Sequence, residues 1–158
     1  MPQPQAAYPH FAVPGLYLEN GYTVTGSPAD PERMYEDENQ LEHCVRRLLL
    51  RKPERLRGWD LRFLRAGLSL AQQDFAAVLG LSVETISEWE LSHAHVPAYA
   101  DLAIRVLFAA RFEPALPLVE LLTYANSSGC PLPAEIHLRH APGRWEAWLP
   151  GDPVPLVH

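Results

Sequence analysis

Between Ser82 and Glu88, side chains of distinct chemistry recur at helical spacing. Val83 offers an apolar surface suited to a thymine methyl group, and the carboxylates of Glu84 and Glu88 can each accept a hydrogen bond from cytosine N4. Residues three and four positions apart share one face of a helix, so these groups would lie together if the segment is helical. The pattern suits contact with base edges, provided that neighbouring elements hold such a helix at the surface.

Two short helices separated by a glycine would provide that support. Three apolar residues at helical spacing predict the buried face of a helix over 71–79, namely Phe75, Ala76 and Leu79. Gly80 can end this helix because glycine adopts a positive φ at little cost. Ser82 can cap a second helix, in which Ile86 and Trp89 would face inward. A helix, a tight turn containing glycine and a second helix make a helix-turn-helix unit.

Short motifs keep a fixed spacing along residues 57–112. They are Leu64-Arg65, Leu70-Ala71-Gln72, Phe75-Ala76, Leu79-Gly80-Leu81-Ser82, Thr85-Ile86-Ser87, Trp89-Glu90 and Pro97. Together they resemble the Cro/CI-like (XRE) family of helix-turn-helix DNA-binding domains. The resemblance implies a mainly α fold, a lambda-repressor-like helix-turn-helix bundle with short β-hairpins in the N- and C-terminal extensions. It also implies an ion pair between Arg65 and Glu90 that ties the first helix to the third.

We expect eight residues at the DNA interface: Gln72, Ser82, Val83, Glu84, Thr85, Ser87, Glu88 and His93. In the family that the chain resembles, Gln72 touches a DNA phosphate. The positions that meet the major groove there are those of Ser82, Val83, Glu84 and Glu88. His93 lies in the loop after that helix, where it could meet phosphate. The chain departs from the family pattern at Ala71, where a Ser or Thr cap is usual, and at Glu88, where a basic or amide side chain is common.

A basic stretch precedes the helix-turn-helix unit. From Arg46 to Arg65 there are eight basic and two acidic residues, whereas the whole chain has a formal net charge of −6. A basic stripe on an acidic protein can serve as a phosphate footprint. The residues predicted to contact phosphate in this way are Arg46, Arg47, Arg51 and Arg62. The alternative is that Arg46, Arg47 and Arg51 form the solvated face of an amphipathic helix.

The rest of the chain divides into an N-terminal extension (1–52), the helix-turn-helix domain (53–112) and a C-terminal extension (113–158). Strand-forming arms on either side of Asn20-Gly21 predict a β-hairpin over 16–25. The helices expected outside the central unit cover 38–52, 58–66, 97–112 and 116–125, and a second hairpin covers 135–149. Two helices have a predicted buried stripe, composed of Leu41, Cys44, Val45, Leu48 and Leu49 in the first and of Leu102, Ala103, Val106, Leu107 and Ala110 in the 97–112 helix.

The outer segments also resemble regulators related to the MqsA-type antitoxins, but the paired zinc cysteines of those proteins are missing here. His137 and His140 are three apart on a predicted strand and would converge poorly, even with Cys130. We therefore expect no metal and no cofactor. Catalytic motifs are also missing, so no enzymatic activity is expected.

The sequence predicts a cytoplasmic, sequence-specific DNA-binding transcriptional regulator that acts as a homodimer on double-stranded DNA. No apolar run is long enough for a membrane span, and the N-terminus lacks a signal peptide. The first alternative is the antitoxin of a type II toxin–antitoxin system, which would bind a toxin protein and repress its own operon. The second alternative is a protein-interaction adaptor that does not bind DNA.

Overall fold

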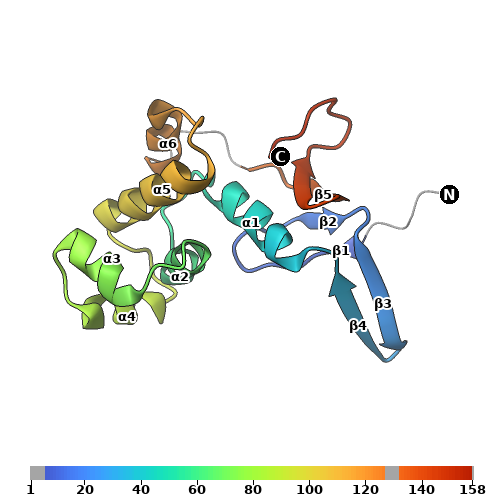
Figure 1. Cartoon of the computed structure of the whole chain (residues 1–158), viewed down its shortest axis with the longest axis horizontal. Coiled ribbons are helices and arrows are strands. Elements are labelled where there is room, and N and C mark those ends of the chain that lie inside the picture. Colours follow the sequence, from blue (N-terminus) through green and yellow to red (C-terminus); the bar gives the residue numbers. More distant parts are fainter. Residues whose placement is uncertain (1–5, 127–131, 158) are drawn as a thin grey trace. The chain divides into compact units, whose positions relative to one another are not determined.

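The computed structural model describes residues 6–126 and 132–157, which divide into two compact units (Figure 1). The first unit comprises Met1–Leu48 and Pro133–His158, and the second comprises Leu49–Leu132. Both ends of the chain belong to the first unit. The units therefore have different bounds from the three consecutive segments expected from the sequence.

The first unit contains, within its described residues, a four-stranded sheet of order β1-β2-β5-β6 and a separate two-stranded sheet. The strands are β1 (Ala6–Ala7), β2 (Leu16–Leu18), β3 (Tyr22–Ser27), β4 (Asp30–Tyr35), β5 (Ile136–Ala141) and β6 (Arg144–Trp148). The central pair, β2 and β5, is parallel, with Leu18 opposite Leu138. All other strand pairs are antiparallel. The parallel pair joins the two ends of the chain in one sheet.

Helix α1 (Glu38–Leu49) confirms the amphipathic helix predicted over 38–52. Each residue of its predicted stripe is buried, namely Leu41, Cys44, Val45, Leu48 and Leu49. The second predicted hairpin is also confirmed, because β5 and β6 pair with Ala141 opposite Arg144. Both elements have a strong local pattern of apolar residues, which explains why the sequence was sufficient.

The hairpin predicted on either side of Asn20-Gly21 is wrong. β2 pairs with β1 and β5, whereas β3 pairs with β4 through a turn after Ser27. Asn20 instead bonds to β5, since its side chain accepts from the N–H of His140 at 2.6 Å and donates to the His140 carbonyl at 3.1 Å. Gly21 has a φ of 72°, and a Cβ there would lie 2.5 Å from that of His140. The two residues thus hold a connection between two sheets.

The prediction of a mainly α, lambda-repressor-like bundle is wrong for the chain, which is an α/β protein. Its described residues combine six helices with a mixed four-stranded sheet and a two-stranded sheet. The prediction treated the strands near the two ends as separate hairpins. It failed because pairing between residues about 120 positions apart leaves no periodic signal in either segment.

The second unit is helical in its described part (Figure 1). Its helices are α2 (Gly58–Gly67), α3 (Gln72–Leu79), α4 (Val83–Glu90), α5 (Ala98–Phe112) and α6 (Leu118–Ala125), and each was expected. The fully buried apolar side chains include Leu61, Leu64, Phe75, Ile86, Ile104 and Phe108. Among the described residues, no helix is both long enough and apolar enough to cross a membrane.

The stripe predicted for α5 is wrong. Its members are half-buried or exposed, and the buried face instead contains Ala100, Asp101, Ile104, Arg105, Phe108 and Ala109. Two charged residues, Asp101 and Arg105, lie on this face, and for that reason the sequence pattern predicted that it would be exposed to solvent. Their burial is possible because Asp101 and Arg105 pair with each other, with Nε 2.7 Å from Oδ1.

Candidate nucleic-acid interface

Helices α3 and α4 form the predicted helix-turn-helix. Gly80 ends α3 with a φ of 68°, the left-handed conformation expected of a glycine cap. The N–H of Leu81 then donates to the carbonyl of Ala76 at 2.9 Å, which closes the turn. Ser82 caps α4, because its hydroxyl accepts from the N–H of Thr85 at 3.3 Å. Local residues therefore determine the direction in which α4 leaves the turn.

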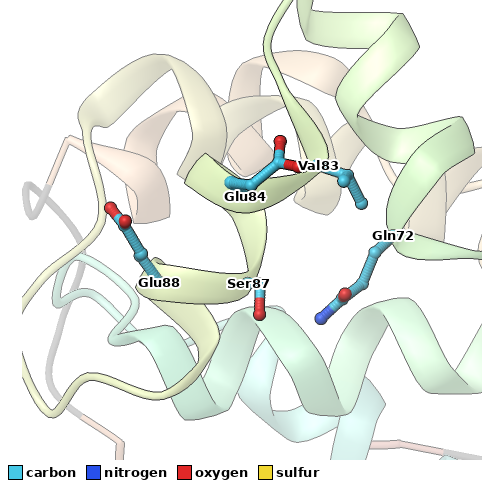
Figure 2. A pocket seen from close by; sticks show the side chains of 5 residues that line it. All are labelled: Gln72, Val83, Glu84, Ser87 and Glu88. Atoms are coloured by element: carbon cyan, nitrogen blue, oxygen red, sulfur yellow. The ribbon is translucent and has the colours of Figure 1, made fainter.

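A shallow depression of about 400 Å³ lies between α3 and α4. It is lined by five of the eight residues predicted at the DNA interface, namely Gln72, Val83, Glu84, Ser87 and Glu88 (Figure 2). Val83, Glu84 and Glu88 are exposed, whereas Gln72 and Ser87 are half-buried. Figure 2 shows the Gln72 side chain extending from α3 toward the α4 residues. The helix-turn-helix thus gathers side chains from two helices on one surface.

The three other predicted residues lie outside this depression. Ser82 and Thr85 bond to each other through their hydroxyls at 2.9 Å, so both serve the start of α4. His93 is exposed after α4, with its ring centroid 3.9 Å from that of Trp59. Its carbonyl accepts from Arg57 Nη1 at 2.8 Å. His93 thereby belongs to a surface formed with the start of α2.

The predicted ion pair between Arg65 and Glu90 is confirmed. Arg65 Nε donates to Glu90 Oε1 at 2.6 Å, and Nη2 donates to Oε2 at 2.9 Å. The Glu90 side chain is only 2% exposed, so this is a buried bidentate contact between α2 and α4. Arg65 Nη1 also donates to the carbonyl of Leu70, just before α3. The guanidinium of Arg65 therefore connects α2 to α4 and to the segment before α3.

Gln72 joins this network from α3. Its Nε2 donates to Glu90 Oε2 at 2.7 Å, so one amide hydrogen is already used inside the protein. A side-chain amide has two donor hydrogens. The phosphate contact implied by the family resemblance would require the second hydrogen or the backbone N–H. Sequence reasoning did not anticipate the bond to Glu90.

The four arginines predicted to contact phosphate differ in exposure, so they do not form one exposed basic surface. Arg51 pairs with Glu113, since its Nη2 donates to Oε1 at 2.9 Å and its Nη1 lies 2.7 Å from Oε2, and the Arg51 side chain is 14% exposed. The Arg46 side chain is 12% exposed and lies 4.0 Å from Glu42, and burial lowers the pKa of Arg46. Arg47 is half-buried on α1, and Arg62 is exposed on α2. Of the four predicted phosphate contacts, Arg62 is the one that is exposed.

Arg105 and Asp101 form a buried hub that sequence reasoning missed. The guanidinium of Arg105 donates to the carbonyls of Leu50, Lys52 and Glu54 at 3.0, 2.7 and 2.7 Å. Asp101 Oδ2 accepts from the N–H of Leu56 at 2.6 Å. These bonds fix the segment before α2 against α5. The available signal was an Asp and an Arg four positions apart on an otherwise apolar helix.

The surface around α3 and α4 is acidic. The sequence contains neither Lys nor Arg between Arg65 and Arg105. The acids in this interval are Asp74, Glu84, Glu88, Glu90 and Asp101. Glu90 and Asp101 are paired internally, which leaves Asp74, Glu84 and Glu88 exposed. Such a surface repels phosphates, and the cations nearest in sequence are those of α2 and the segment before it.

The histidines of β5 point to different partners. His137 lies between Glu19 and Glu135, at 2.6 Å from each, and His140 lies 2.8 Å from Asp37. Burial opposes the charged form of His137, but hydrogen bonds to these two glutamates raise its pKa. Within the described residues, no group of three or more His, Cys, Asp or Glu side chains is placed to hold a metal ion. Cys130 lies outside the described residues.

Comparisons with protein-family models, with curated proteins and with solved structures found no match to this chain.

Proposed function

We propose that the second unit binds double-stranded DNA as a sequence-specific transcriptional regulator, with α4 in the major groove. The exposed face of α4 carries this proposal. Val83, Glu84 and Glu88 have no role in the core, yet they project from a helix that is held firmly at both ends. Ser82 fixes its start, and Glu90 fixes its end through Arg65. Rigid presentation of short side chains is what direct reading of base edges requires.

Phosphate contacts would come from α2 and the segment before it. Arg55, Arg57 and Arg62 are exposed there, and the Arg57 side chain remains 47% exposed although it contacts Glu54. One recognition helix contacts few base pairs, so we propose that the chain acts as a homodimer on an inverted repeat. We propose a cytoplasmic location, in keeping with a role in DNA binding.

A protein-interaction adaptor is the second candidate, and the acidic face of α3 and α4 favours it. Asp74, Glu84 and Glu88 would oppose the approach of a phosphate backbone. The same carboxylates could bind a basic segment of another protein. The two candidates differ in their response to removal of a single exposed carboxylate.

Selection of bound DNA from a random pool would separate the candidates. Wild type, Glu84→Gln and Asp74→Asn are compared at one salt concentration. Both variants lose one exposed acid, but Asp74 does not line the depression. If α4 reads bases, both variants gain non-specific affinity, whereas only Glu84→Gln changes the preferred base, with about 1–3 kcal/mol of discrimination lost. If no protein enriches any sequence, sequence-specific DNA binding is refuted and the adaptor remains.

The salt dependence of binding tests the phosphate contacts. Arg62→Gln should reduce the slope of log K against log salt by about one unit and weaken binding equally on all sequences. Arg111→Gln removes an exposed arginine from the last turn of α5 and serves as the control. Equal slopes for Arg62→Gln and wild type would remove Arg62 from the proposed interface.

A further inference from the structure

The side-chain amide of Gln72 has a fixed orientation. Its Nε2 donates to Glu90 Oε2 at 2.7 Å, and Arg65 donates to both oxygens of the same carboxylate. An ionised carboxylate accepts hydrogen bonds but cannot donate them. The opposite orientation of the amide would therefore set Gln72 Oε1 against an oxygen of Glu90, with no hydrogen between them. Glu90 thus selects the nitrogen of the Gln72 amide.

This orientation leaves the amide oxygen of Gln72 available at the surface. Within the part of the chain that the structure describes, no group donates to Gln72 Oε1. This oxygen is not one of the buried side-chain atoms that lack a partner, so it is open to solvent. Because Gln72 lines the depression between α3 and α4 (Figure 2), a molecule bound there would meet the amide at its oxygen.

The charged groups of the depression are acceptors too. Glu84 and Glu88 are exposed, and neither forms a hydrogen bond or an ion pair with any described residue. The Ser87 hydroxyl can donate or accept, and Val83 adds an apolar contact that is 36% exposed. Acceptors therefore predominate in the depression, and a molecule that fits it has to supply hydrogen-bond donors.

Two kinds of donor face the major groove of DNA, namely the amino groups N4 of cytosine and N6 of adenine. Guanine and thymine present acceptors at the corresponding positions. We propose that Gln72 determines specificity by accepting, through Oε1, a hydrogen bond from one of these amino groups. Glu90 is the positioning residue, because it holds the Gln72 nitrogen away from the base. The inference rests on the DNA binding proposed above, and it gives Gln72 a base to read in place of the phosphate contact that the family resemblance implies.

The fixed orientation adds discrimination between bases. A glutamine amide that rotates freely can accept from an amino group or donate to guanine O6 and N7, because it carries both an acceptor and donors. Gln72 is restricted to the first role. A base that presents an acceptor to Oε1 would leave both groups unpaired, and such mismatches reject the wrong partner. The buried pair of Arg65 and Glu90 therefore contributes to the choice of sequence.

Selection of bound DNA from a random pool locates the base pair that Gln72 contacts. Wild type, Gln72→Met and Gln73→Met are compared in the full chain, and Gln73 is the matched control because it is exposed on α3 and does not line the depression. Gln72→Met should lose at least about fivefold of its discrimination at one base pair and keep its other preferences, whereas Gln73→Met should match wild type. Equal weakening on all sequences would indicate a phosphate contact and overturn the proposal.

Base analogues then identify the atom that Gln72 contacts. At that base pair, adenine is replaced by purine, or cytosine by 2-pyrimidinone, because each analogue lacks the amino group. In parallel, the purine base of the pair is replaced by its 7-deaza form, which lacks the N7 acceptor. Loss of the amino group should weaken binding by wild type at least about fivefold and binding by Gln72→Met no more than about twofold, whereas loss of N7 should weaken both proteins equally. An effect of Gln72 that depends on N7 alone, or on neither atom, would overturn the proposal.

Side-chain NMR of the free protein tests the positioning by Glu90 and separates this inference from DNA binding. The Gln72 amide proton bonded to Glu90 should resonate at lower field than the amide protons of the exposed Gln73, and Glu90→Gln should remove this difference. In the analogue assay, Glu90→Gln should also respond less than wild type to loss of the amino group. A Gln72 amide that matches Gln73 in wild type would overturn the inference even if the protein binds DNA. If wild type enriches no sequence, the proposed function fails, and base reading by Gln72 fails with it.

Discussion

Replacement of Arg105 by Ala is the sharpest test of how the second unit is held together. The Arg105 side chain is fully buried, and its guanidinium makes bonds to Asp101 and to three backbone carbonyls of the segment before α2. Truncation to Ala leaves the carboxylate of Asp101 buried without its counter-charge. It also removes the donor from these three carbonyls.

Removal of one partner from a buried ion pair costs about 3–5 kcal/mol. Each buried carbonyl that loses its donor adds a cost of about 1–3 kcal/mol, unless water replaces the donor. The total stability of a domain is about 5–15 kcal/mol. Arg105→Ala should therefore remove at least about 4 kcal/mol, most of the stability of a domain at the lower end of this range.

Urea unfolding followed by far-UV circular dichroism measures this loss, because α2 to α6 all belong to the second unit. Arg111→Ala is the matched control, since it truncates an exposed arginine of the same helix whose guanidinium lies 5.2 Å from the Phe112 ring. Its expected cost is at most about 1 kcal/mol. The double variant Asp101→Asn/Arg105→Met removes both charges and should be more stable than Arg105→Ala. If Arg105→Ala costs no more than Arg111→Ala, the hub does not stabilise the unit.

Three further predictions concern other contacts. Glu90→Ala leaves Arg65 unpaired and should cost about 3–5 kcal/mol, seen as a lower melting temperature, and a change within error would contradict it. Gly58→Ala should destabilise the second unit by more than about 1 kcal/mol, measured by urea unfolding, because the added Cβ would lie 1.6 Å from the Trp89 carbonyl oxygen. A variant as stable as wild type would show that α2 and α4 separate easily. Burial, with a smaller effect of nearby positive charge, lowers the pKa of His10 to about 4. Because the unfolded chain binds this proton near pH 6.5, the stability contribution of His10 should decrease as the pH falls from about 6.5 to 4, and an NMR titration that gives a pKa near 6.5 would refute this.

The helices were predictable because each carries its own signal. Period and capping residues define α1, and Gly80 and Ser82 define the turn between α3 and α4. The Arg65–Glu90 pair followed from motif spacing rather than from physics alone. Its extension to Gln72 was missed, because an amide that serves a buried carboxylate is indistinguishable in sequence from one exposed to solvent.

The sheets and the basic stretch were less predictable. Parallel pairing of β2 with β5 depends on contacts between distant residues, so strand-like stretches near Leu16 and Ile136 did not reveal each other. Asn20-Gly21 has the composition of a hairpin turn but serves packing against β5. Arg51 and Arg105 illustrate a common difficulty, since an arginine that bonds to buried partners cannot be told from a surface arginine by residue type. The hydrogen-bond partners of an arginine, which only the structure shows, decide whether its side chain is buried.

The acidity of α4 determines how the proposed DNA binding would work. Carboxylates at Glu84 and Glu88 weaken attraction to every phosphate backbone, whatever its sequence. At a site that presents cytosine N4 groups, the same carboxylates would recover part of this loss through hydrogen bonds. Discrimination between sites depends on the ratio of specific to non-specific affinity. A helix that lowers the non-specific affinity can therefore be selective even when its total affinity is modest. A regulator of this kind would bind each site weakly as a monomer, and a homodimer on an inverted repeat would raise the affinity by joining two recognition helices.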